Sequence, residues 1–271
     1  MTKLTMLGSG HAMVTKCYNT CFVIQNEEGA VLVDAGGGNG ILSQMEQAGI
    51  SWESLQAMFL THAHTDHILG GIWVLRKINV LMKQGKFQGN FTVYGLQAGL
   101  SFLEKSCEFL LKDPLNDKIH FVAVENEDEF SVIKIQFRVF DIHSTKMPQI
   151  GFRAEFTKGW KEPFEKISLA CLGDEPYHET CLKYVENADW LLSEAFCLSK
   201  DKDIFKPYEK HHSTALDAGK IAHKLKVSHL IMYHTEDSDL ENREKNYRKE
   251  AAKNFDGDIY VPRDLETIVL G

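Results

Sequence analysis

The sequence predicts an α/β protein whose sheets are covered by helices. Short apolar runs recur along its 271 residues, which is typical of buried strands. Segments with apolar residues at helical spacing lie between many of these runs, and glycine-rich or polar turns separate the two kinds of segment. Because no repeat, low-complexity stretch or linker interrupts the pattern, we expect a single domain over residues 1–271.

The first part of the chain begins with strands and then alternates strands with helices. Gly36-Gly37-Gly38 marks a sharp turn into the first helix, and Asp113-Pro114 ends the third. We expect strands at residues 4–7, 21–24, 30–33, 57–60 and 91–94, and helices near residues 41–48, 68–82 and 96–111.

The rest of the chain adds a run of strands and then alternates helices with strands again. We expect strands at residues 119–124, 131–141, 151–156, 167–172, 190–194, 229–233, 259–261 and 267–270. Helices are expected at residues 177–186, 214–225 and 239–254. The last of these carries charges of both signs, which is typical of a solvent-exposed helix.

The composition restricts the partners that this protein can have. A net charge of −8 argues against broad, sequence-independent binding of nucleic acid, although it is compatible with a local basic patch. The first ten residues lack the apolar core of a secretory signal, and no stretch reaches the apolar length of a membrane helix. Most of the six cysteines lie in apolar runs, so we expect reduced thiols in a cytoplasmic protein without a membrane partner. A metal pair formed by Cys17 and Cys21 is the weaker alternative.

The densest group of metal-binding side chains follows the expected strand at residues 57–60. Within one short turn the chain carries His62, His64, Asp66 and His67. Imidazole and carboxylate groups bind first-row metals, and imidazole particularly suits zinc. So compact a cluster can hold two ions side by side, and a two-metal site is typical of hydrolytic enzymes.

Three further ligand-type residues each follow an apolar strand. They are His143, Asp174 and His234. Because α/β folds gather strand ends at one edge, we expect these side chains to meet the histidine cluster. The predicted sets are His62, His64 and His143 for one ion and Asp66, His67 and His234 for the other, with Asp174 bridging them. Nitrogen and oxygen donors without thiolate predict two divalent ions, with zinc preferred over manganese or iron, and a bridging hydroxide at neutral pH.

These residues resemble the metallo-β-lactamase superfamily, whose signature is H-x-H-x-D-H, and within it the ribonuclease Z branch. The likeness extends along the chain through segments that match the family's glycine turn, D-x-G turn, G-D motif, H-E-A segment and H-S-T segment. In this sequence they are Leu7-Gly8-Ser9-Gly10, Val33-Asp34-Ala35-Gly36, Gly173-Asp174, Ser193-Glu194-Ala195 and His212-Ser213-Thr214.

The resemblance implies a four-layer αβ/βα sandwich, the metallo-β-lactamase fold, with the metals at the edge between two sheets. It implies hydrolysis of a phosphodiester by a metal-bound hydroxide, which Asp66 would help to orient. It assigns His212, paired with Glu194, to proton transfer to the leaving oxygen, and it implies a homodimer. A plain helix-capping position is the alternative interpretation of His212.

Four departures from the family leave the substrate open. About thirty residues separate His143 from Asp174, where ribonuclease Z enzymes usually carry a long arm that grips tRNA. Leu96 replaces the family's proline, Ser193 replaces the histidine of H-E-A, and Lys16-Cys17-Tyr18-Asn19 replaces the usual Arg-Asn. The predicted substrate is therefore either the 3′ end of tRNA or a small phosphodiester such as a cyclic nucleotide, with sulfate and carboxyl esters as variants of the second case. A metal-binding regulatory protein without turnover is the alternative from another class.

Overall fold

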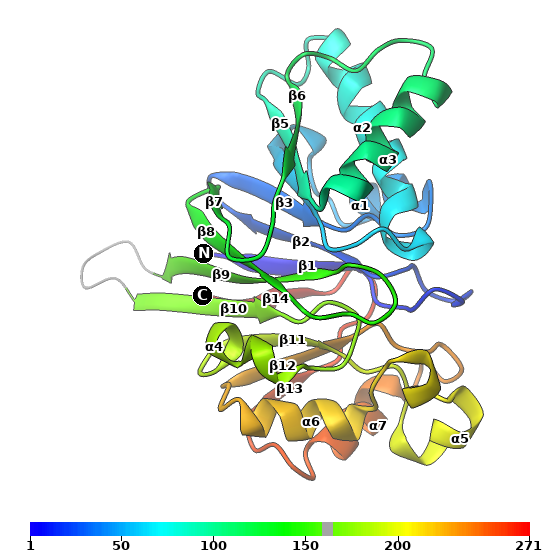
Figure 1. Cartoon of the computed structure of the whole chain (residues 1–271), viewed down its shortest axis with the longest axis vertical. Coiled ribbons are helices and arrows are strands. Elements are labelled where there is room, and N and C mark those ends of the chain that lie inside the picture. The colour runs from blue at the N-terminus through cyan, green and yellow to red at the C-terminus, as the bar shows by residue number, and fades with distance from the viewer. Residues whose placement is uncertain (159–164) are drawn as a thin grey trace.

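The computed structural model has two sheets packed face to face with helices on both outer sides (Figure 1). It describes residues 1–158 and 165–271. Each sheet has seven strands, and the helix–sheet–sheet–helix order confirms the predicted αβ/βα sandwich. In the described part of the chain, no helix combines the length and the apolar character needed to cross a bilayer.

The first sheet is built almost entirely from the N-terminal part of the chain. Its strand order is β14 (Thr267–Val269), β1 (Lys3–Gly8), β2 (Cys21–Asn26), β3 (Gly29–Val33), β4 (Leu55–Leu60), β5 (Phe91–Gly95) and β6 (Ile119–Ala123). Its outer face is covered by α1 (Gly40–Gln47), α2 (Thr65–Lys83) and α3 (Gln97–Leu110). In α2, Val74, Leu75 and Ile78 lie on one face and are fully buried, as the helical spacing of apolar residues predicts.

The second sheet contains most of the remaining strands. Its strand order is β13 (Asp258–Tyr260), β12 (His229–Tyr233), β11 (Trp190–Glu194), β10 (Glu165–Cys171), β9 (Ile150–Lys158), β8 (Ile135–Asp141) and β7 (Glu129–Val132). The helices on its outer side are α4 (Leu182–Val185), α6 (Ala215–Lys224) and α7 (Arg243–Ala251). Strands β10 to β13 are parallel, so the chain segments that follow β10, β11 and β12 emerge at the same edge.

The largest apolar core lies between the two sheets. Phe59 of the first sheet meets Phe152 of the second with ring centroids 5.3 Å apart, and Phe137 packs on Phe152 at 5.4 Å. All three rings are fully buried, and burying a side chain of this size contributes about 1.5–3 kcal/mol. This core fixes the relative position of the two sheets, whose loops together form the candidate site.

Three expected elements differ from the structure. The strand expected at residues 131–141 is a hairpin, because Ile133 and Lys134 both adopt left-handed conformations (φ 49° and 59°) and reverse the chain between β7 and β8. The helix expected at residues 177–186 is reduced to a turn and α4, and the one expected at residues 239–254 is confined to α7. The short helix α5 (Lys202–Phe205) was not predicted.

Candidate metal centre

The central histidines lie where β4 turns into α2. The strand ends at Leu60, and α2 begins at Thr65 with His64 as its N-cap residue. His62 and His67 are buried, whereas the side chain of His64 is 30% exposed and faces the pocket. Asp66 lies in the first turn of α2, where the positive end of the helix dipole favours a carboxylate.

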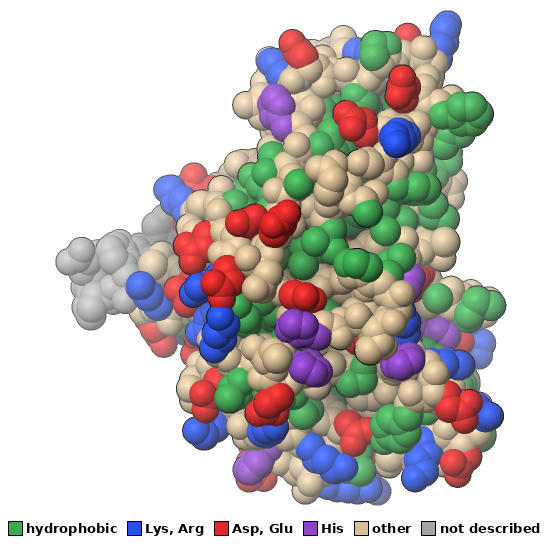
Figure 2. All heavy atoms as spheres, in the orientation of Figure 1, with side chains coloured by type: hydrophobic (Ala, Val, Ile, Leu, Met, Phe, Trp, Pro, Cys, Tyr) green, Lys and Arg blue, Asp and Glu red, His purple; other side chains and the backbone are tan. Residues whose placement is uncertain are grey.

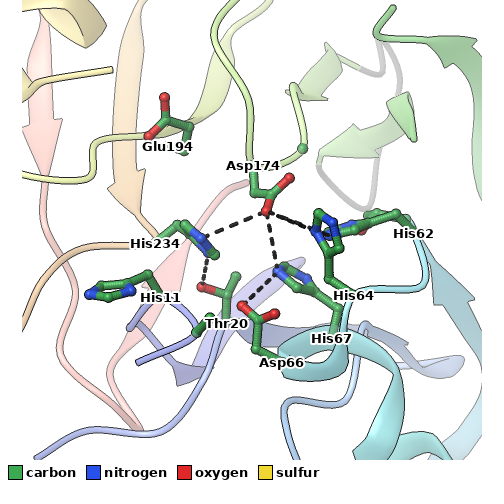
Figure 3. Close-up of polar contacts among 12 residues, drawn as sticks. His11, Thr20, His62, His64, Asp66, His67, Asp174, Glu194 and His234 are labelled. Carbon is green, nitrogen blue, oxygen red and sulfur yellow. Dashed lines mark hydrogen bonds and ion pairs between the residues drawn. The ribbon is translucent and has the colours of Figure 1, made fainter. Parts of the chain in front are cut away.

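The side chains of the two sheets converge on one carboxylate oxygen (Figure 3). Asp174 Oδ2 lies 3.5 Å from His62 Nε2 and 3.9 Å from His64 Nδ1. The same oxygen lies 3.7 Å from both His67 Nε2 and His234 Nε2. Among the described residues, two sets of three donors that share no residue result, in which all ligand atoms lie within 4.8 Å of one another: His62, His64 and Asp174, and Asp66, His67 and His234. A third such group, Asp34, His62 and His67, overlaps both sets.

The chemistry of these donors fits two divalent ions. Among the described residues, the buried atoms His67 Nε2 and Asp174 Oδ1 have no hydrogen-bond partner. Such orphaned atoms are costly unless a ligand or ion satisfies them. Burial opposes ionisation of Asp174, but the neighbouring His62 and other histidines hold its pKa well below the usual range. Burial and the adjacent His67 lower the pKa of His62 to about 4, so this imidazole is neutral, as metal ligation requires.

Hydrogen bonds to buried residues orient two of the candidate ligand histidines. Asp34 Oδ2 accepts a hydrogen bond from His67 Nδ1 at 2.8 Å, and Asp34 also accepts from the backbone and hydroxyl of Thr61. His234 follows β12 of the opposite sheet, and its Nδ1 lies 3.0 Å from Oγ1 of Thr20, which precedes β2 of the first sheet. Both Asp34 (φ 54°) and His234 (φ 57°) adopt left-handed conformations, a form of backbone strain that is concentrated at functional sites.

Close packing of α2 against the turn after β3 brings His67 into contact with Asp34. A Cβ atom at Gly70 would lie only 1.8 Å from the carbonyl oxygen of Ala35. The Gly70 N–H donates to Gly36 O at 2.8 Å. A larger residue at position 70 would therefore push α2 away from the turn that carries Asp34.

The structure does not bring His143 to either set of donors. It follows β8 in a left-handed conformation (φ 59°), and its side chain is 46% exposed. Its Nδ1 lies 3.6 Å from Asp141 Oδ2, and its ring lies 5.1 Å from that of His178. The turn after β8 thus directs this predicted ligand away from His62 and His64, and Asp174 completes their set instead.

The predicted pair of proton-transfer residues lies beside the metal-binding donors. His212 Nδ1 and Glu194 Oε2 are 3.8 Å apart, which is longer than a hydrogen bond, and neither atom has another partner among the described residues. Burial and the charge of Lys146 lower the pKa of His212 to about 4. Burial raises the pKa of Glu194 to about 8, although the N–H and hydroxyl of Ser213 oppose this shift.

Sequence reasoning missed several residues of the site. Asp34 was noted only as part of a turn, yet its position after an apolar strand is the same signal that singled out Asp174. Thr20 precedes β2, and no pattern in the surrounding sequence marks it as a functional residue. Lys146 and Lys210 belong to loops whose path the sequence does not fix, although both line the pocket in front of the donors.

The fold and the site define a member of the metallo-β-lactamase superfamily, in the ribonuclease Z-like branch. The family model of the anti-Pycsar protein Apyc1 matches residues 2–159, more than half of the chain, so the chain belongs to this family. An Apyc1 of Bacillus phage vB_BveM-Goe7 is 29% identical over 48% of this chain and 47% of its own.

Two other comparisons extend over the whole chain. A ribonuclease Z of Pyrobaculum aerophilum is 26% identical, with 100% of this chain and 99% of its own covered. The solved structure of the metallo-β-lactamase fold protein YhfI from Bacillus subtilis superposes with a TM-score of 0.77 at 20% identity, covering 98% of each chain. The chain is therefore placed among the metal-dependent hydrolases of this superfamily.

Proposed function

We propose that this protein is a single-domain, binuclear metal-dependent phosphodiesterase that acts on small anionic phosphodiesters. The observation that carries the proposal is the pair of donor sets that meet at Asp174. Zinc suits their nitrogen and oxygen donors, with manganese or iron as alternatives. When bound, two such ions supply a nucleophile derived from water at neutral pH and neutralise charge on the phosphoryl group.

The protein's own residues position the ions and the proton. Asp174 lies between the two donor sets and fixes their separation. Asp66, whose Oδ2 lies 3.4 Å from His67 Nε2, supplies a carboxylate to the second set. His212 delivers a proton to the leaving oxygen, and Glu194, whose Oε2 lies 3.8 Å from His212 Nδ1, orients the imidazole once the two groups tighten into a hydrogen bond on substrate binding. In the free protein the low pKa keeps His212 neutral. A bound phosphodiester anion has the opposite charge to Lys146, so it raises the pKa of His212 and favours the imidazolium.

The pocket and the surface favour a small substrate. The pocket in front of the donors has a volume of about 310 Å³, which suits a ligand the size of a nucleotide. Acidic and basic side chains are interspersed over the face drawn in Figure 2, without a continuous basic surface on it. The short connection between His143 and Asp174 also lacks the length of a tRNA-gripping arm.

The second candidate function is cleavage at the 3′ end of tRNA. It is favoured by curated relatives named ribonuclease Z that align with the full length of the chain. Three substrates distinguish the candidates when zinc-supplemented protein is assayed with and without chelator. We expect chelator-sensitive turnover of bis(p-nitrophenyl) phosphate and a cyclic nucleotide, with little cleavage of precursor tRNA. Failure to cleave any phosphodiester by metal-loaded protein would refute the proposed function.

A further inference from the structure

Two lysines face the pocket that the metal-binding donors line. Lys146 lies on the loop between β8 and β9, and Lys210 lies on the segment that leads into α6. Both line the same 310 Å³ pocket as Asp66 and Asp174. The pocket therefore combines the candidate metal ligands with two positive charges that come from separate loops.

Specific contacts hold the Lys146 loop against the metal-binding edge. Glu175, the residue after Asp174, is buried and accepts a hydrogen bond of 2.6 Å from Ser144 Oγ. Thr145 Oγ1 lies 2.9 Å from His211 Nδ1, which joins the loop to the segment that carries Lys210. The position of Lys146 is thus tied to the chain next to Asp174 and is not that of a freely moving surface side chain.

Neither ammonium group is neutralised by the protein. Lys146 Nζ donates to His212 Nε2 at 3.4 Å, and Lys210 Nζ lies 5.1 Å from the centre of the Phe196 ring. Within the described residues, neither nitrogen lies within 4.0 Å of a carboxylate oxygen. Many surface lysines, in contrast, form ion pairs, as Lys83 does with Asp113 at 3.0 Å.

We propose that Lys146, assisted by Lys210, binds the phosphate oxygens of the substrate and sets the preference for an anionic ester. This inference rests on the proposed phosphodiesterase function and adds the residues that select its substrate. A lysine is a compact point charge that binds phosphate well, and Lys146 already reaches the imidazole that faces the leaving group. On substrate binding, its ammonium exchanges the neutral acceptor His212 for an anionic oxygen, which is the stronger partner.

The test compares Lys146→Met, Lys146→Arg and the control Lys105→Met, which removes an exposed lysine of α3. For each metal-loaded protein, inorganic phosphate binding is measured by calorimetry, bis(p-nitrophenyl) phosphate turnover by absorbance, and metal content by elemental analysis. We expect K146M to weaken phosphate binding and raise KM by about tenfold to a hundredfold, the value of one charge-assisted hydrogen bond. K105M should stay within about threefold of the wild type, K146R should bind phosphate more tightly than K146M because it keeps the charge, and all should keep their metal.

The outcomes separate this inference from the proposed function. If the wild type binds phosphate but K146M binds it equally well, Lys146 is not an anion-binding residue and the inference is wrong. Wild-type protein that takes up metal yet binds no phosphate overturns the inference as well. If K146M loses phosphate binding while the wild type turns over no phosphodiester, the proposed function fails and the anion site stands.

Discussion

Replacing Asp34 by asparagine tests whether the buried hydrogen bonds behind the metal centre determine its affinity. Two oxygens of Asp34 accept three hydrogen bonds: Oδ1 accepts from the Thr61 N–H, and Oδ2 accepts from the Thr61 hydroxyl and from His67 Nδ1. Asparagine keeps the shape but exchanges one acceptor oxygen for an NH₂ donor. Whichever way the amide points, one donor of the protein then faces another donor.

The two orientations of the amide have different consequences. If the NH₂ replaces Oδ1, it opposes the Thr61 backbone N–H, which cannot change. If it replaces Oδ2, His67 can accept its hydrogen bond only by moving its proton to Nε2, the atom that faces the metal. Loss of such an orienting partner typically costs 10–100-fold in metal affinity, or about 1.4–2.7 kcal/mol.

The assay is competition for zinc against a chromogenic chelator, with urea unfolding of the metal-free protein as a measure of folding. We expect Asp34→Asn to lower zinc affinity by about 10–100-fold. It should also destabilise the metal-free protein by about 1–3 kcal/mol, because one buried donor is left without an acceptor. Asp113→Asn, at an exposed ion pair, is the matched control and should change neither value appreciably.

Thr20→Val provides a second variant in case Asp34→Asn does not fold. It removes the hydroxyl 3.0 Å from His234 Nδ1 without changing charge, and we expect about a tenfold loss of zinc affinity. Zinc affinity within about twofold of the wild type in both folded variants would refute the reasoning, because the histidines would then be oriented without these partners.

Four other expected outcomes concern metal, nucleophile, proton and substrate. Protein purified without added metal should contain about one to two metal equivalents by elemental analysis, and a value near zero with full activity in chelator would contradict this. Asp66→Ala should stay folded yet lose turnover; near wild-type rates would show that this carboxylate is dispensable. His212→Ala should slow release of a poor alkoxide leaving group by ~10²–10⁴-fold but affect p-nitrophenolate much less, and equal losses would exclude the acid role. Binding of tRNA should be weak; tight, strongly salt-dependent binding with a single cut at the 3′ trailer would instead establish tRNA as substrate.

Most of the fold could be predicted because its signals are local. Buried strands such as β4 and β12 consist of apolar runs, and α2 carries a continuous apolar face. The hairpin between β7 and β8 was missed for a physical reason. Its turn residues are Ile133 and Lys134, which rarely adopt left-handed conformations, so no Gly or Asn marked the reversal.

The sequence could predict only those site residues whose positions are determined by the end of a strand. His62, Asp174 and His234 lie within three residues of the ends of β4, β10 and β12, so the sheets carry them to one edge. His143 also follows a strand, yet the loop after β8 leaves its side chain 46% exposed beside Asp141, and the path of a loop is not encoded in a spacing pattern. The lysines of the pocket depend on loop paths and on contacts such as that of Glu175 with Ser144, which link distant parts of the chain.

The charge of the pocket differs from that of the molecule, and this difference bears on substrate size. A net charge of −8 is spread over a surface on which both signs are interspersed, and screening limits its reach to about 8 Å at physiological salt. Under the proposed function, a small phosphodiester inside the pocket would therefore interact mainly with Lys146, Lys210 and the ions that the donors hold. A tRNA would place many phosphates along the outer surface, where it meets the mean charge of the protein and releases few counterions. The same distribution of charge thus favours one buried phosphate and disfavours a polyanion.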